Sequence, residues 1–298
     1  MKIIVTGSLG NISRPLAIEL IEKGHDVTVI SSSASKQHEI EKLGANAAIG
    51  FLEDSDFLAN TFGGADGVYT MIPPGNYFDP NLDIIAYYIR LGETYAHAIE
   101  KSGVKRVVNL STIGGNLDKG NGILAGAHNV ERILNELPAA VAITHMRPNS
   151  FYYNLFGYID MIKSEGVIAA NYGGDHIIPW VSPIDIAAAV AEEFLTPFTG
   201  RKARSIASED LSGNETAKIL GNAIGKPDLR WEVISDEATL NGLISLGMNP
   251  TIAAGLVEMY SGLHSGLLLE DYYRNKPAVM GKVKMRDFAQ DFAAAFKQ

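Results

Sequence analysis

The chain has 298 residues, enough for one large domain or two, with the 46% hydrophobic and 20% charged content of ordinary globular proteins. It contains no cysteine, which excludes disulfides, thiolate metal sites and a cysteine nucleophile. A formal net charge of −9 disfavours nucleic-acid binding, and no apolar run reaches the roughly 20 residues that cross a membrane, so a cytoplasmic protein is expected.

The chain starts with a short run of mainly β-branched residues at 2–5 that predicts a buried strand, and the glycines after it turn directly into a helix predicted at 10–23. Gly7 permits a tight turn, and Gly10 lets the backbone approach a pyrophosphate, which the helix N-terminus attracts. Ser13 stands where the usual dinucleotide fingerprint has a third glycine. The loop predicts a dinucleotide site, although such a match alone is a weak signal.

The second predicted strand, at 26–30, ends in Ser31-Ser32-Ser33. In nicotinamide dinucleotide sites the residues just past this strand distinguish NAD from NADP. No carboxylate is present there to hold a ribose 2′-hydroxyl, whereas the serine hydroxyls and Lys36 can bind a 2′-phosphate. We therefore predict NADP. A serine-rich turn in which Ser33 or Ser35 caps the next helix is also expected and is compatible with that prediction.

Alternating strands and helices continue up to a turn at Pro73-Pro74-Gly75. The predicted elements are a helix at 36–43, a strand at 45–50, a short helix at 54–61 and a strand at 67–72. Ligands of open α/β sheets bind at the carboxyl ends of strands, so Met71, Ile72 and Pro73 are expected neighbours of the dinucleotide. A proline that only forms a turn is an equally good interpretation.

A long helix at 81–102 and a strand at 106–110 lead to Ser111. A hydroxyl at the end of a central strand faces the same crevice as the glycine loop, so Ser111 is the leading polar candidate for contact with substrate. The alternative is a hydroxyl that only secures the strand end. A helix at 122–137 and a strand at 141–147 follow. The whole alternation predicts a Rossmann-type α/β domain over residues 1–150, with a doubly wound parallel sheet.

Beyond Asn149 the pattern changes to an aromatic run, Phe151-Tyr152-Tyr153-Asn154-Leu155-Phe156, which indicates either a pocket wall or a plain core cluster. Ser182 followed by Pro183 predicts the start of a helix that runs to residue 195 and packs back on the sheet. Short strands near 205–207 and 229–234 and several helices predict a smaller α+β lobe at 151–298, which closes over the cofactor cleft.

Four stretches together resemble the NmrA-like proteins, a family of atypical short-chain dehydrogenases. In chain order they are Val5-Thr6-Gly7-Ser8-Leu9-Gly10, Val107-Val108-Asn109-Leu110-Ser111-Thr112, Val130-Glu131-Arg132-Ile133-Leu134 and Met146-Arg147-Pro148-Asn149-Ser150-Phe151-Tyr152-Tyr153-Asn154. The resemblance covers essentially the whole chain. It implies a Rossmann fold, a small C-terminal substrate lobe and NADP binding. It does not imply one activity, because similar proteins include quinone and azo reductases as well as dinucleotide-sensing partners of transcription factors.

The resemblance also implies roles for individual residues in cofactor binding. By this resemblance the pyrophosphate would be bound by Gly7, Gly10, Asn11 and Ile12, and the ribose phosphate by Ser31, Ser32 and Lys36. Adenine would lie against Phe51 and Leu52. The ribose and nicotinamide half would lie against Met71, Ile72 and Pro73, with Ser111 close by.

The chain departs from the typical short-chain dehydrogenases in its proton donor. Those enzymes use a tyrosine that donates a proton and a lysine, one helical turn away, that lowers the tyrosine pKa. Only Tyr272 and Lys276 have this spacing, far downstream of Ser111, so we interpret the spacing as chance. Family members often carry lysine or histidine where this chain has Ala127, and the adjacent His128 is interpreted as a surface residue. The scattered histidines predict no zinc site.

Two functions fit these observations. The first is an NADPH-dependent reductase that delivers hydride to a quinone-like or other small conjugated acceptor, with Ser111, Tyr152 and Tyr153 nearest the chemistry. Such an acceptor suits the missing tyrosine–lysine pair, because charge on the reduced oxygen is delocalised and a weak acid or water supplies the proton. The alternative is a non-catalytic NADP(H) sensor whose lobe closure is read by a protein partner.

Overall fold

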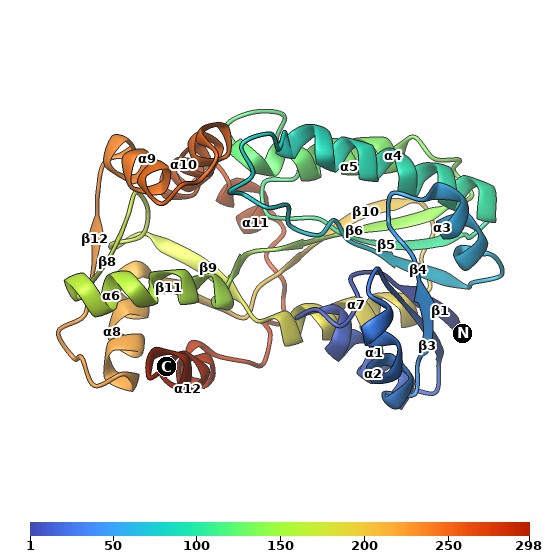
Figure 1. Cartoon of the computed structure of the whole chain (residues 1–298), viewed down its shortest axis with the longest axis horizontal. Coiled ribbons are helices and arrows are strands. Elements are labelled where there is room, and N and C mark those ends of the chain that lie inside the picture. Colours follow the sequence, from blue (N-terminus) through green and yellow to red (C-terminus); the bar gives the residue numbers. More distant parts are fainter.

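A seven-stranded, fully parallel sheet forms the larger of two lobes in the computed structural model, which describes residues 1–298 (Figure 1). Its strand order is β10-β6-β5-β4-β1-β2-β3. The strands are β1 (Lys2–Val5), β2 (Asp26–Ser31), β3 (Asn46–Ile49), β4 (Gly67–Thr70), β5 (Arg106–Leu110), β6 (Ala142–Pro148) and β10 (Arg201–Ile206). The chain winds outward from β1 to β3 and then returns to β4 on the other side of β1. The predicted doubly wound α/β fold is confirmed, and its topological switch point lies between β1 and β4.

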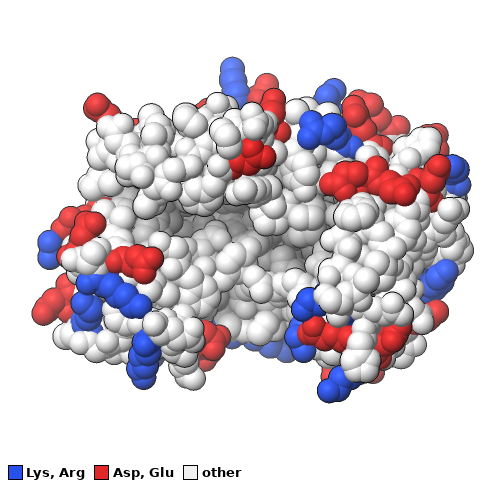
Figure 2. All heavy atoms as spheres, in the orientation of Figure 1, with Lys and Arg blue, Asp and Glu red and all other residues white.

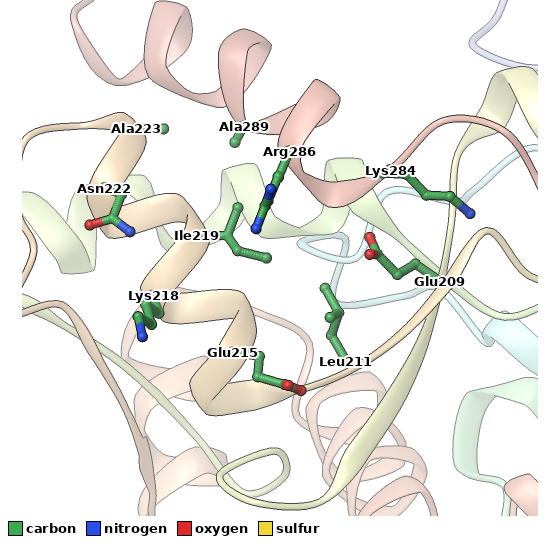
Figure 3. Close-up of a pocket in the computed structure, with 10 residues that line it drawn as sticks. All are labelled: Glu209, Leu211, Glu215, Lys218, Ile219, Asn222, Ala223, Lys284, Arg286 and Ala289. Carbon is green, nitrogen blue, oxygen red and sulfur yellow. The ribbon is translucent and has the colours of Figure 1, made fainter.

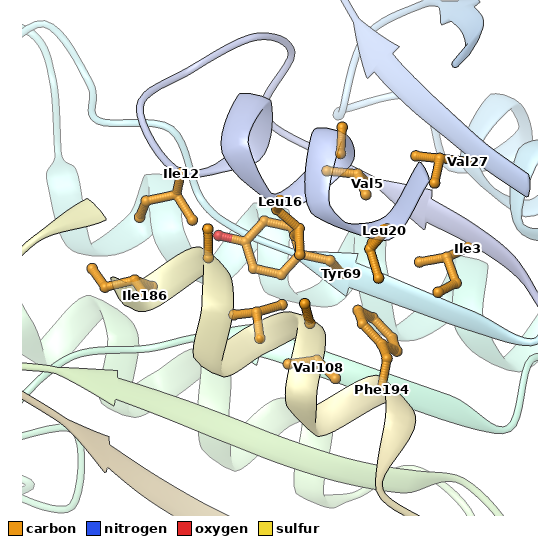
Figure 4. Close-up of a cluster of buried hydrophobic side chains, with 14 of the residues drawn as sticks. Ile3, Val5, Ile12, Leu16, Leu20, Val27, Tyr69, Val108, Ile186 and Phe194 are labelled. Carbon is orange, nitrogen blue, oxygen red and sulfur yellow. The ribbon is translucent and has the colours of Figure 1, made fainter. Parts of the chain in front are cut away.

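Helices cover both faces of this sheet because neighbouring strand residues point to opposite sides. Ile3 and Val5 pack on one face against α1 (Ser13–Glu22), α2 (Gln37–Lys42) and α7 (Pro183–Leu195), as Figure 4 shows for Leu16, Leu20 and Phe194. Ile4 packs on the other face. That face is covered by α3 (Ser55–Phe62), α4 (Ile84–Ser102) and α5 (Ala125–Asn135). The sheet is therefore buried on both sides, as in other parallel sheets.

The seventh strand comes from the second half of the chain. A strand was expected near 205–207 in the smaller lobe, but β10 lies in the large sheet and pairs in parallel with β6. Its basic residues Lys202 and Arg204 both reach Glu193 of α7, at 2.6 and 3.4 Å, and that carboxylate is almost fully buried. The helix predicted from Ser182 is confirmed as α7, with the Ser182 side chain accepting a hydrogen bond from the Ile184 N–H. The domain boundary near residue 150 stays a prediction.

The smaller lobe has two small sheets and its own aromatic core. Its core residues include Tyr152, Trp180, Phe288 and Phe292. One sheet has the order β11-β9-β7, and the other pairs β12 with β8. The strands are β7 (Ser150–Phe151), β8 (Val167–Ala170), β9 (Ile177–Val181), β11 (Glu209–Ser212) and β12 (Arg230–Val233). The helices are η3 (Tyr152–Tyr158), α6 (Ile159–Glu165), α8 (Gly213–Ala223), α9 (Asp236–Ser245), α10 (Pro250–His264), α11 (Leu269–Arg274) and α12 (Met285–Phe296).

One helix of the smaller lobe, α10, packs directly on the larger lobe. Ile252 and Leu256 form a buried cluster with Ile84 of α4. At the short helix η2 (Gly122–Leu124), Gly122 has a positive φ of 54°, and a Cβ on it would overlap the Gly255 carbonyl oxygen of α10. The two backbones therefore meet with no side chain between them.

The segment Pro250–Arg274, which contains α10 and α11, is the one stretch whose length and composition would allow it to cross a membrane. Its mean hydropathy is 1.2, and 44% of the apolar window is buried inside the protein. The contacts of Ile252 and Leu256 with the larger lobe, and of Leu263 with the core of the smaller lobe, account for that composition. A helix that is apolar because it lies in a protein core passes the same test.

Candidate functional site

The glycine loop between β1 and α1 is closed by Ser13. The Ser13 hydroxyl donates a 2.7 Å hydrogen bond to the Thr6 carbonyl oxygen and lies directly against Gly7. Gly7 has a φ of 90°, and a Cβ on it would lie 2.6 Å from the Ser13 Oγ. Ser13 therefore does more than replace a third glycine, because its hydroxyl ties the loop together in a way that requires a bare Gly7.

The N-terminus of α1 has unpaired backbone donors. The N-cap residue Ile12 offers no side-chain cap, and the N–H groups of Asn11, Ile12 and Ser13 have no acceptor within the protein. Helix N-termini carry a partial positive charge, so these donors suit a pyrophosphate. Gly10 is exposed beside them. The residues present here therefore fit a dinucleotide, at the loop where the sequence predicted one.

Two serines connect the glycine loop with the end of β2. Ser8, the only non-glycine residue with a positive φ, donates its hydroxyl to the Ser31 Oγ at 2.9 Å. Ser31 is 3% exposed and also accepts the Ser33 N–H at 3.2 Å. Ser31 therefore holds the turn together, whereas Ser32 is exposed. The expected cap by Ser33 or Ser35 is wrong: the two hydroxyls lie 2.7 Å apart, and neither caps the following helix.

An ion cluster lies next to this serine turn. The Lys36 Nζ lies 2.9 Å from one oxygen of Glu39, and the Arg14 guanidinium lies 3.1 Å from the other. The hydrogen bond from Lys36 lowers the pKa of Glu39. Sequence reasoning predicted Lys36 but missed Arg14 and Glu39, which only the packing of α1 against α2 brings together.

The residues predicted along the adenine and nicotinamide halves lie at the ends of β3 and β4. Phe51 follows β3 with 63% of its surface exposed, and Leu52 is half-buried. The Met71 side chain lies beside Gly7, and the Met71 carbonyl accepts the Tyr95 hydroxyl at 2.8 Å. Ile72 is buried, and Pro73 is partly exposed. Their contacts with a cofactor stay predictions.

Ser111 belongs to a buried ionic network at the end of β5. Its hydroxyl donates to Glu131 at 2.5 Å, and Arg147 binds the same carboxylate through Nε at 2.9 Å and Nη2 at 2.6 Å. Arg147 also reaches Asp271 of α11 at 3.0 Å, which links the two lobes. Burial alone would raise the pKa of Glu131, but the hydrogen bonds and charges around it lower that pKa overall. The Ser111 hydroxyl therefore already donates its hydrogen bond to Glu131. This favours the interpretation in which Ser111 only secures the strand end.

Tyr152 does not face the cleft. It is 1% exposed, its ring stacks on Phe288 and Trp180, and its hydroxyl donates to the Val283 carbonyl at 3.2 Å. This burial does not favour the predicted place of Tyr152 near the chemistry, and a catalytic role for it stays an untested prediction. The aromatic run is a core cluster at this position.

Tyr153, the next residue, is only partly buried. Its ring centre lies 5.2 Å from that of Phe151. The pKa of Tyr153 is raised, mainly by burial and to a smaller extent by the Tyr77 phenol, and no hydrogen bond contributes to the shift. Burial and then the phenols of Tyr77, Tyr87 and Tyr153 raise the pKa of Tyr88. Burial and then the phenols of Tyr158 and Tyr77 raise the pKa of Tyr260. Tyr77, Tyr88 and Tyr260, from the loop after β4, from α4 and from α10, also pack against the same buried cluster of Ile84, Ile252 and Leu256.

Figure 2 shows a hollow between the two lobes whose walls carry no charged residues at the centre. The phenols of Tyr77, Tyr88 and Tyr260 come from both lobes, because α4 and the loop after β4 belong to the larger lobe and α10 to the smaller one. A hollow with no charged residue at its centre suits an apolar molecule better than a charged one.

Asn249 fixes the loop that carries Tyr77. Its backbone N–H donates to the Tyr77 carbonyl at 2.9 Å, and its side-chain amide donates to the carbonyls of Asp79 and Leu82 at 2.9 and 3.3 Å. The same side chain caps α10 by accepting the Thr251 N–H. A single residue of the smaller lobe thus sets the position of the loop that follows β4.

Tyr69 of β4 has an unsatisfied hydroxyl. The side chain is fully buried, and Figure 4 shows its oxygen directed toward Ile12 at the start of α1. A buried hydroxyl without a partner is uncommon in proteins.

The remaining polar candidates have structural partners. Tyr272 and Lys276 both bind Asp210 of β11, at 2.7 and 2.5 Å, so their spacing ties α11 to a strand. The His128 ring lies 3.0 Å from the Gly115 carbonyl. No three His, Asp or Glu side chains are grouped in a way that could hold a metal ion.

A surface pocket of about 800 Å³ lies on the smaller lobe between α8 and α12 (Figure 3). Apolar residues such as Leu211 and Ile219 line it, with Lys218 and Arg286 beside them. None of its residues belongs to the glycine loop or to the strand ends of the large sheet. It is therefore separate from the predicted dinucleotide site.

Comparisons with known proteins agree on the fold and on a family. Residues 1–265 match the sequence model of the NmrA-like family. The chain is 25% identical over 301 residues to an NAD(P)H azoreductase of Xenophilus azovorans, and the match covers 99% of both chains. An NADPH-dependent quinone oxidoreductase of Escherichia coli, solved with NADPH, superposes with a TM-score of 0.80 at 17% identity, covering 97% of this chain and 99% of that one. A triphenylmethane reductase of Citrobacter sp., solved with NADP(H), gives 0.77 at 18% identity, covering 98% and 99%.

Proposed function

The chain belongs to the NmrA-like family, and on that basis we propose that it is an NADPH-dependent reductase of quinone-like or other small conjugated acceptors. The observation that carries the proposal is the open glycine loop with its unpaired backbone donors, and a hollow with no charge at its centre lies between the two lobes. The named relatives support the substrate class, because azo compounds, quinones and triphenylmethane dyes are all conjugated. No contact in the chain favours the alternative of a sensor read by a protein partner.

The larger lobe supplies the cofactor contacts in this proposal. Gly7, Gly10 and the N–H groups of Asn11 and Ile12 hold the pyrophosphate, while the exposed ring of Phe51 offers a face to adenine. Lys36 is the proposed partner of a 2′-phosphate, with Arg14 and Ser32 beside it. A nicotinamide dinucleotide, when bound, supplies the hydride.

Tyr153 is the proposed proton donor. A carbonyl or azo group that accepts hydride also needs a proton, and a positioned side chain supplies it faster than bulk water. The Tyr153 phenol is protonated at neutral pH, as any ordinary tyrosine is, so it has a proton to give. Burial and the Tyr77 phenol raise its pKa, which makes it a weaker acid than a free tyrosine. Tyr77, Tyr88 and Tyr260 provide the aromatic surroundings, and Ser111 acts through Glu131 as a structural support of the strand end.

The proposed activity is tested by following NADPH absorbance with and without a water-soluble naphthoquinone. We expect oxidation only when the acceptor is present, and Tyr153→Phe should lower kcat by about 100-fold while leaving NADPH affinity unchanged. Tyr273→Phe, which alters an exposed tyrosine of α11, is the matched control and should keep full activity. An unchanged kcat in Tyr153→Phe would show that Tyr153 is not the proton donor. No oxidation with quinone, azo or triphenylmethane acceptors would contradict the reductase itself.

The preference for NADPH is tested at Lys36. Lys36→Ala should weaken NADPH binding about tenfold, because one charge-assisted hydrogen bond to phosphate is lost, and should leave NADH binding within about twofold. Binding is measured by quenching of tryptophan fluorescence. Lys42→Ala, at the far end of α2, serves as the control for a general loss of positive charge. Equal losses for both dinucleotides would refute a 2′-phosphate contact at Lys36.

A further inference from the structure

We propose that Glu39 limits the preference of this site for NADP, so that the protein also accepts NAD. The inference rests on the proposed dinucleotide binding and concerns how the adenosine end is recognised. It identifies a specificity-determining residue on α2, outside the positions just past β2 where such a residue is normally found.

The fold brings Glu39 to the 2′ side of the predicted site. After β2 the chain passes through the serine turn and the short helix η1 (Ala34–Lys36), and then enters α2. The Glu39 carboxylate lies between Lys36, three residues earlier, and Arg14 at the start of α1, with one oxygen for each cation. All three side chains are partly exposed, with 38–49% of their surface accessible, so an incoming ligand can reach them.

The serine turn has few hydroxyls left for a phosphate. Ser31 is buried and serves Ser8 and the Ser33 N–H, and the hydroxyls of Ser33 and Ser35 face each other. Only Ser32 of the predicted run is exposed without such a bond. Binding of a 2′-phosphate therefore depends mainly on Lys36 and Arg14, and Glu39 is the residue that holds both.

The charges around the ribose determine whether NADP or NAD is favoured. Two cations and one carboxylate leave a net charge of about +1 for a phosphate that carries close to −2. The phosphate must share the cations with Glu39 and is repelled by it. A ribose 2′-hydroxyl is neutral and can donate a hydrogen bond to a carboxylate oxygen. Glu39 therefore opposes NADP and supports NAD at the same site.

A role in folding stability would not explain the ion pairs of Glu39 with Lys36 and Arg14 as well as a role in dinucleotide selectivity does. Exposed ion pairs of this kind contribute little to stability, so removal of Glu39 should hardly change the unfolding midpoint. A change in dinucleotide selectivity without a change in unfolding temperature is then the specific signature of the proposed role.

The test is Glu39→Gln, which keeps the size of the side chain and removes its charge. Dissociation constants for NADP⁺, NAD⁺ and the fragment 2′,5′-ADP are measured by calorimetry at low salt, together with the unfolding temperature. We expect NADP⁺ and 2′,5′-ADP to bind about tenfold more tightly and NAD⁺ to bind equally or more weakly. Glu41→Gln is the matched control, because Glu41 lies on the same helix but bonds with Gln37 instead of Lys36 or Arg14.

The outcomes separate the two proposals. An unchanged ratio of NAD⁺ to NADP⁺ affinity in Glu39→Gln, with both dinucleotides still bound, would overturn the role of Glu39 and leave the proposed function standing. An equal rise in NADP⁺ affinity in Glu41→Gln would also overturn it, because net charge alone would then account for the effect. Failure of the unaltered protein to bind either dinucleotide would contradict the proposed function.

Discussion

Replacing Arg147 with methionine should lower the free energy of unfolding by about 3–5 kcal/mol. The substitution leaves the Glu131 carboxylate, whose side chain is 7% exposed, without the two hydrogen bonds that now balance its burial. It also removes the link to Asp271 between the lobes. Urea unfolding measures the loss. Arg132→Met on the same helix as Glu131 is the control, because Arg132 forms only a 3.9 Å pair at the surface and should matter by less than about 0.5 kcal/mol.

The pH dependence of this loss provides a second measurement. The pKa of Glu131 is lowered in the folded protein, so the stability from its ion pair is present above the ordinary glutamate pKa and disappears as pH falls through the lowered value. In Arg147→Met the buried carboxyl takes up a proton more readily. The difference in unfolding free energy between the two proteins should therefore begin to narrow as pH falls through the pKa of the unpaired carboxyl in the variant, above the ordinary glutamate value of about 4.3. It should go on narrowing until Glu131 of the unaltered protein is protonated as well. A difference that stays constant from neutral to acid pH would mean that lost packing, rather than the unpaired carboxylate, causes the effect.

Gly122→Ala should destabilise the protein by about 2–4 kcal/mol. Gly122 has a φ of 54°, which is unfavourable for alanine, and the new methyl group would overlap the Gly255 carbonyl oxygen of α10. Backbone cannot move aside as a flexible side chain can, so η2 and α10 must separate. Thermal and urea unfolding measure the change. Gly242→Ala in α9 is the control, because nothing lies within 4 Å of its Cβ position, and it should be neutral or slightly stabilising.

The same variant should affect turnover more than cofactor binding. The α10 helix carries Tyr260, which packs with Tyr77 at the contact between the lobes, and it is preceded by Asn249, which anchors the loop after β4. A displaced α10 therefore moves this loop, where we expect the acceptor side of the site. The glycine loop lies in the larger lobe and does not touch α10. Equal losses in NADPH affinity and in kcat would contradict this division of roles between the lobes.

Most of the large sheet could be predicted from the sequence because its strands are short apolar runs bounded by glycine, proline and helix caps. β10 was misplaced for a physical reason. It is an edge strand in which Lys202 and Arg204 point to a partner, Glu193, that only the folded chain reveals. An edge strand needs no continuous apolar run, so its sequence resembles a polar loop.

The glycine loop was predictable because a local pattern of glycines fixes its geometry. Which of Tyr152 and Tyr153 enters the core could not be predicted from the sequence. Both lie in the 3₁₀ helix η3, where consecutive side chains are rotated by about 120°, so one enters the core while its neighbour does not. The ion cluster of Arg14, Lys36 and Glu39 was equally hidden, because Arg14 joins it only through the packing of two helices that are distant in sequence.

The parallel pairing of β10 with β6 also constrains how this protein can be made. Ile143 of β6 pairs with Arg201 of β10 only after the chain has left for the smaller lobe and returned. During translation the edge of β6 therefore stays open until the later segment has emerged from the ribosome. An open edge of a parallel sheet can pair with another nascent chain. The long sequence separation of this contact also favours slow closure. We therefore expect the two lobes to complete folding together, because the large sheet is finished only when β10 pairs with β6.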